Sequence, residues 1–79
     1  MDYTGYVDGI DVIATQGQPV RCLAFINRQP GGEYIQVETE EHRLQGALEL
    51  ASTKRVEVEV TYEDTGGAKV LRRVRLLDR

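Results

Sequence analysis

Residues 56–77 read VEVEVTYEDTGGAKVLRRVRLL, and this stretch decides the fold class of the chain. Valine alternates with glutamate from Val56 to Val60. That is the two-residue period of a β-strand and not the 3.6-residue period of a helix. The turn-forming residues 64–68 separate this strand from a second apolar segment that carries basic residues. The stretch therefore predicts an antiparallel β-hairpin.

The charges on the two strands predict how this hairpin pairs. If acidic residues of the first strand face basic residues of the second, the same register also places apolar residues opposite one another. The predicted partners are Glu63 with Lys69, Glu59 with Arg73, Glu57 with Arg75, Val58 with Val74, and Val56 with Leu76.

Three further strands are expected before this hairpin. The first covers residues 6–14, and Gly9 inside it indicates a bulge or a bend. The second covers residues 20–28 and the third residues 33–38, with residues 30–31 (Pro-Gly) fitting the centre of a type II turn. The register expected for the second and third strands pairs Arg28 with Glu33, Ile26 with Ile35, and Ala24 with Val37.

One helix is expected between the third strand and the hairpin. Thr39 is a suitable N-cap, and the acidic residues after it favour a helix N-terminus. The helix is expected to end at residues 52–53. Residues with the spacing of one helical face form its apolar stripe, namely Leu44, Ala47, Leu48 and Ala51.

The element order is therefore strand, strand, strand, helix, strand, strand, within a single domain of residues 1–79. This order, with a long first strand bent at a glycine, resembles the OB-fold. The resemblance implies a mainly β protein, a five-stranded antiparallel barrel with one α-helix. It also implies that the outer face of strands two and three is the binding face. The same pattern also permits an open α+β sandwich with the helix on one face of the sheet.

Composition limits the functions to be considered. Thirteen acidic and ten basic residues give a net charge of −3, which argues against default binding to nucleic acid or to a membrane surface. A single cysteine cannot form an internal disulfide, and no apolar run approaches the roughly 18 residues of a membrane span. The N-terminus lacks the pattern of a signal peptide. A cytoplasmic location is the expectation.

No pattern of catalytic or metal-binding residues is visible. His42 is the only histidine, and no ligand-like spacing links it to a cysteine or carboxylate. Cys22 alternates with core residues and is expected to be an inert thiol. Asp8 and Asp11 point to opposite faces of a regular strand, unless the bend at Gly9 redirects one of them. We expect no enzyme activity, no cofactor and no metal.

Basic residues are densest at Arg72, Arg73 and Arg75, which makes nucleic-acid contact worth considering. The predicted register pairs Arg73 and Arg75 with glutamates and leaves Arg72 on the apolar face. An unpaired charge there is costly, so the strand bulges, or Arg72 lies at the rim of the barrel, or it pairs with a carboxylate. Arg72 is therefore a candidate site residue.

The second strand is apolar on both sides. Val20, Cys22, Ala24 and Ile26 can line the core, yet Leu23 and Phe25 are apolar on the opposite face. Such a strand is usually covered on both faces. We expect this second face to be covered by another subunit, by a ligand, or by the domain's own helix or N-terminal segment. The candidate residues of this face are Arg21, Leu23, Phe25, Asn27, Tyr34 and Gln36.

These observations predict a non-catalytic binding or assembly module that forms homo-oligomers through the outer face of its second strand. The alternative is an OB-type binder of single-stranded nucleic acid or oligosaccharide, in which Phe25 and Tyr34 stack on the ligand. Nucleic acid is the less favoured ligand because the chain is weakly acidic. No interaction with a membrane is expected.

Overall fold

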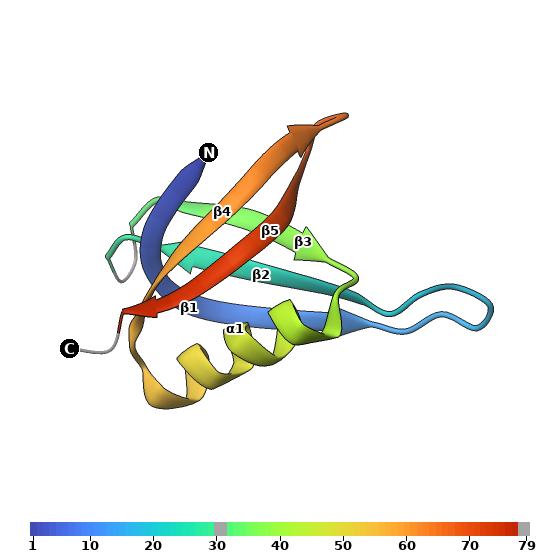
Figure 1. Cartoon of the computed structure of the whole chain (residues 1–79), viewed down its shortest axis with the longest axis horizontal. Coiled ribbons are helices and arrows are strands. Elements are labelled where there is room, and N and C mark those ends of the chain that lie inside the picture. The colour runs from blue at the N-terminus through green and yellow to red at the C-terminus, as the bar shows by residue number, and fades with distance from the viewer. Residues whose placement is uncertain (30–31, 78–79) are drawn as a thin grey trace.

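The structure is a computed structural model that describes residues 1–29 and 32–77. These residues form a closed barrel of five strands with one helix (Figure 1). The elements are β1 (Asp2–Ile13), β2 (Arg21–Asn27), β3 (Tyr34–Thr39), α1 (His42–Lys54), β4 (Glu57–Thr65) and β5 (Ala68–Leu77). Around the barrel the strands run in the order β1-β2-β3-β5-β4. The OB-like prediction is confirmed, and the open sandwich is wrong because the sheet closes.

Closure of the barrel requires one contact between strands that was not predicted from the sequence. β3 and β5 are parallel and share the single pair Glu38 and Val70, whereas every other strand pair is antiparallel. The barrel is therefore mixed and not purely antiparallel.

β1 completes the barrel on the other side because it pairs with two neighbouring strands. Its first part, Asp2 to Tyr6, pairs with β4, and its remaining part, from Tyr6 to Ile13, pairs with β2. The strand curves strongly between them (Figure 1). A bulge between Val7 and Gly9 confirms the irregularity expected at this glycine. The strand begins earlier than predicted because pairing with β4 extends it.

The register of β2 with β3 is confirmed. Ala24 faces Val37 and Ile26 faces Ile35, as their alternation predicted. The turn expected at residues 30–31 lies outside the described residues.

The register of the β4–β5 hairpin differs from the prediction. Gly66 and Gly67 have φ angles of 59° and 84°, and they form a two-residue turn in place of the expected five-residue loop. A second irregularity between Thr61 and Tyr62 leaves Arg72 as an extra residue of β5. Arg73 faces Thr61 and not Glu59 as predicted. The other observed partners are Thr65 with Ala68, Asp64 with Lys69, Glu63 with Val70, Tyr62 with Leu71, Val60 with Val74, Glu59 with Arg75, Val58 with Leu76, and Glu57 with Leu77.

The helix packs against the barrel through its predicted stripe. Leu48 and Ala51 are buried in the core, and Leu44 packs at its edge. The N-cap is Glu41 and not Thr39, because Thr39 ends β3 and its hydroxyl oxygen accepts a hydrogen bond from the Glu41 backbone N–H. The helix also runs slightly further than predicted, and its C-cap, Arg55, is left-handed with φ 56°.

The core is formed by side chains from the inner faces of four strands together with the helix. Its buried members are Cys22, Ala24, Ile26, Val37, Leu48, Ala51, Val58, Val60, Tyr62 and Leu71.

Among the glycines that the structure describes, Gly5 is the position at which a side chain conflicts most with the fold. A Cβ atom there would lie 2.2 Å from the backbone oxygen of Asn27. We therefore expect Gly5→Ala to lower the free energy of unfolding by about 2 kcal/mol or more, because the backbone of β1 or β2 must move. Urea denaturation followed by circular dichroism measures the change.

Gly46→Ala is the matched control. Gly46 lies in the interior of α1, and a Cβ there would have no neighbour within 4 Å. This substitution should raise the free energy of unfolding by up to about 1 kcal/mol, since alanine favours the helix. Equal effects of the two substitutions would contradict the role assigned to Gly5.

Candidate functional site

The outer surface of the β1–β2–β3 sheet carries most of the residues expected to bind. Because β2 lies between β1 and β3, each outward side chain of β2 has a neighbour on either side. Leu23 lies between Asp11 and Glu38, Phe25 between Gly9 and Gln36, and Asn27 between Tyr6 and Tyr34. We call this surface, together with Ile13 and its partner Arg21, the outer face.

Phe25 and Leu23 are half-buried on the outer face and are not part of the core cluster. Phe25 covers Gly9, where a Cβ atom would lie 3.6 Å from its Cδ2. The Phe25 ring also meets the Tyr34 ring edge to face, with 5.7 Å between centroids. Among the described elements, α1 packs mainly against β1, β5 and β3. The interpretation that the helix covers Leu23 and Phe25 is therefore not supported.

Three exposed residues extend this apolar surface. Tyr6, Ile13 and Tyr34 are 43%, 44% and 60% exposed. With Leu23 and Phe25 they place five large apolar or aromatic side chains on the outward side of three adjacent strands.

Asn27 forms a partly buried polar contact on the same face. Its Nδ2 donates a hydrogen bond of 2.9 Å to Oδ2 of Asp8, the residue at the β1 bulge. The bulge thus redirects Asp8 toward β2, while Asp11 stays beside Leu23. Oδ1 of Asn27 is buried and accepts no hydrogen bond from any described residue.

Arg21 and Gln36 lie at the border between the outer face and the β3–β5 seam. Arg21 donates a 2.6 Å charge-assisted hydrogen bond to Oε2 of Glu38, and both side chains are partly exposed. Arg21, Gln36 and Lys69 share a small cavity of about 260 Å³ beside the tip of the β4–β5 hairpin.

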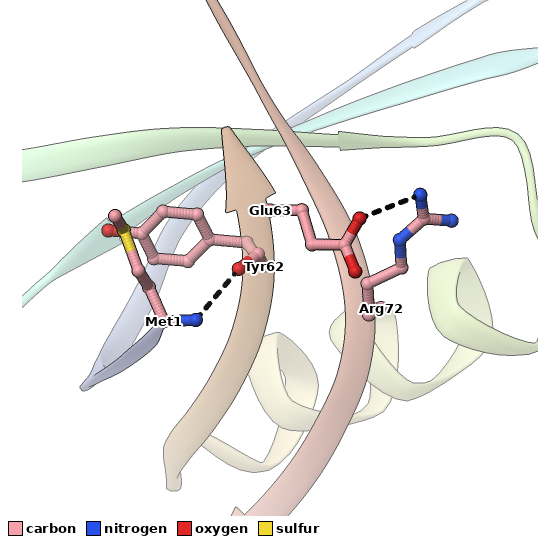
Figure 2. A network of polar contacts seen from close by, with 4 residues as sticks. All are labelled: Met1, Tyr62, Glu63 and Arg72. Atoms are coloured by element: carbon pink, nitrogen blue, oxygen red, sulfur yellow. Dashed lines mark hydrogen bonds and ion pairs between the residues drawn. The ribbon is translucent and has the colours of Figure 1, made fainter. Parts of the chain in front are cut away.

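Arg72 is not on the outer face. As the bulged residue of β5 it donates a hydrogen bond of 3.1 Å to Oε2 of Glu63, whose side chain reaches from β4 toward Arg72 (Figure 2). Two of the three arrangements considered from the sequence therefore hold, a bulge and a carboxylate partner. Both side chains are more than half exposed, so this pair contributes at most about 0.5 kcal/mol to stability.

A groove of about 540 Å³ lies between the end of β3, the start of α1 and β5. Leu44, Val70 and Leu71 are its apolar lining, and Arg21 and Arg72 are among its charged residues. The structure thus brings these two predicted residues together. The groove was not predicted from the sequence because it is formed where β3 meets β5 in parallel.

The residues considered for catalysis remain apart. His42 is the first residue of α1 and is exposed. Residues 1–29 and 32–77 contain no group of three or more histidine, cysteine, aspartate or glutamate side chains placed to hold a metal ion. Cys22 is 1% exposed, and burial, with a smaller contribution from the charge of Glu49, raises the pKa of its thiol.

Comparison with known proteins gives no match, whether to a family model, to a curated protein or to a solved structure. Within the described part of the chain, the helix is neither long nor apolar enough to cross a membrane.

The Cys22 thiol should react only when the protein unfolds. We expect its alkylation by iodoacetamide at pH 8 to be at least about 100-fold slower in the native protein than in urea, since the reagent needs an accessible thiolate. A mass-spectrometric time course measures both rates. Because burial raises the pKa of the Cys22 thiol, the folded protein keeps this proton to a higher pH than the unfolded chain does. The free energy of unfolding therefore falls as the pH rises from the pKa of this thiol in the unfolded chain to its pKa in the folded protein. Fast alkylation of the native protein would contradict this placement.

Proposed function

We propose that the protein is a non-catalytic assembly module that self-associates through the outer face. The observation that carries this proposal is the position of Leu23 and Phe25, which point out of a barrel whose helix packs elsewhere. Burying such side chains against a partner removes apolar surface from water, at about 25 cal/mol per Å².

A second copy suits this face because the face carries both signs of charge. Arg21 is half exposed and donates one hydrogen bond to Glu38, so that several of its N–H groups remain available. Asp11 lies on the same surface and is exposed. A two-fold interface brings a surface against its own copy, and it therefore needs donors and acceptors on one patch.

A binding role is also favoured over an enzymatic one by the chemistry of the face. It offers aromatic, amide and carboxylate groups, and no described nucleophile there lies beside a general base. The thiol of Cys22, the best nucleophile of the chain, is buried on the inner side of β2.

Single-stranded nucleic acid is the weaker alternative. Tyr34 and Phe25 could stack on bases, yet Asp8, Asp11 and Glu38 bring negative charge to the same surface. Several basic side chains each lie within 4 Å of a carboxylate, and this pairing reduces the positive electrostatic potential that a phosphate would meet. They are Arg21, Lys69, Arg72 and Arg75.

Self-association predicts a mass above that of the 8.9 kDa chain at tens of micromolar protein. Phe25→Thr keeps a residue that favours strands but removes the aromatic ring, and it should weaken association by about tenfold or more. Size-exclusion chromatography with light scattering gives the mass at each protein concentration. A clean monomer of the unmodified protein throughout this range would refute the proposal.

Leu50→Thr is the control for this experiment. Leu50 is an exposed large apolar residue of α1, on a different element from the outer face. Its replacement should leave the association constant within about twofold of the original. If both variants lose association equally, the interface is not confined to the outer face.

A further inference from the structure

Asn27 has an unmet hydrogen-bonding capacity at one end of the outer face. The residue is 5% exposed, its Nδ2 donates to Asp8, and its Oδ1 accepts no hydrogen bond from any described residue. A buried acceptor without a donor costs free energy that a ligand N–H or O–H would recover. This oxygen therefore points to a ligand rich in donors.

The groups around Asn27 are acceptors and aromatic rings. The Asp8 carboxylate is anchored by Asn27, and no described residue forms an ion pair with it. Tyr6 and Tyr34 lie on either side of Asn27 in the register, and both are largely exposed. The nearest basic residue in sequence, Arg28, holds its guanidinium over the Tyr3 ring at 4.7 Å and does not pair with Asp8.

We propose that Asp8, Asn27, Tyr6 and Tyr34 form a binding site for a guanidinium group, supplied by an arginine side chain of a partner protein. A guanidinium presents five N–H donors in one plane and stacks its face on aromatic rings. The Asp8 carboxylate accepts two of these donors, and a tyrosine ring receives the face of the cation. Oδ1 of Asn27 is buried in this structure, so its acceptance of a third donor requires a local rearrangement, which the Asn27 side-chain NH₂ signals would report.

Other ligand classes match the site less well. A phosphate brings no N–H donor and is repelled by Asp8. A sugar hydroxyl can donate to Asn27 but carries no charge to balance the carboxylate. An ammonium group balances that charge but lacks the plane that stacks on a ring. The net charge of −3 also favours the approach of a cation.

This site lies at one end of the outer face and so overlaps part of the surface proposed for self-association. Its four residues cluster around the end of β2 at Asn27, whereas Leu23 and Ile13 lie toward the opposite end of the outer face. Phe25 links the two regions through its contact with Tyr34.

The test is a nuclear magnetic resonance titration of ¹⁵N-labelled protein with N-acetyl-arginine amide, up to tens of millimolar, the range of weak single-group contacts. We expect shifts of the Asn27 side-chain NH₂ signals and of the backbone amides of Tyr6, Asp8 and Tyr34. N-acetyl-citrulline amide, which has the same shape without the charge, should bind at least about fivefold more weakly.

Asp8→Asn should weaken arginine binding about tenfold, whereas Asp11→Asn should change it by less than about twofold. Both variants remove one negative charge from β1, so their difference separates the site from general electrostatic attraction. Tyr34→Leu, at an exposed position, should also weaken binding and serves as the test if Asp8→Asn fails to fold. Light scattering on each variant records self-association separately.

Three results would overturn the proposal. The first is equal weakening by Asp8→Asn and Asp11→Asn, and the second is the absence of shifts at these four residues. The third is a response to a neutral maltooligosaccharide without a response to the arginine compound, which would assign the site to sugars.

Discussion

The close approach of Gly5 in β1 to the backbone of Asn27 in β2 is the contact on which the barrel depends. At this point β1 leaves its pairing with β4 and continues along β2, so one strand supplies two sides of the barrel. Only a residue without a Cβ fits, because the Asn27 oxygen occupies the space of a side chain. The bulge between Val7 and Gly9 adds to the curvature that this change of partner requires.

The same closure determines what is left on the outside. The inner faces of the strands and one stripe of α1 fill the core, and the small size of the domain leaves α1 as its single described helix. Leu23 and Phe25 consequently stay half-buried on the outer face, where the Phe25 ring covers Gly9 and meets the Tyr34 ring. Half-buried apolar side chains on an outward sheet face are the observation from which we propose a partner.

Charge distinguishes one end of the outer face from the rest of the surface. Four basic residues around the β3–β5 seam and on the hairpin lie beside carboxylates, namely Arg21, Lys69, Arg72 and Arg75. Asp8 instead has a side-chain amide as its described partner. The β1 bulge is responsible for this difference, since it moves Asp8 out of the regular alternation and toward Asn27. An irregularity of the backbone thus places a carboxylate against Asn27, which lies between two exposed tyrosines.

The sequence by itself determined the elements, because strand and helix periods and a glycine-rich turn are local properties of the chain. It also determined the β2–β3 register, where alternation allows one arrangement of Ala24 and Ile26. It did not determine the β4–β5 register, because a turn of Gly66 and Gly67 and a bulge at Arg72 shifted the partners predicted from charge. Tertiary structure alone decided the parallel contact of β3 with β5, the groove beside it and the pairing of Asp8 with Asn27. These features join residues that are distant in sequence, and closing the barrel is the physical step that brings them together.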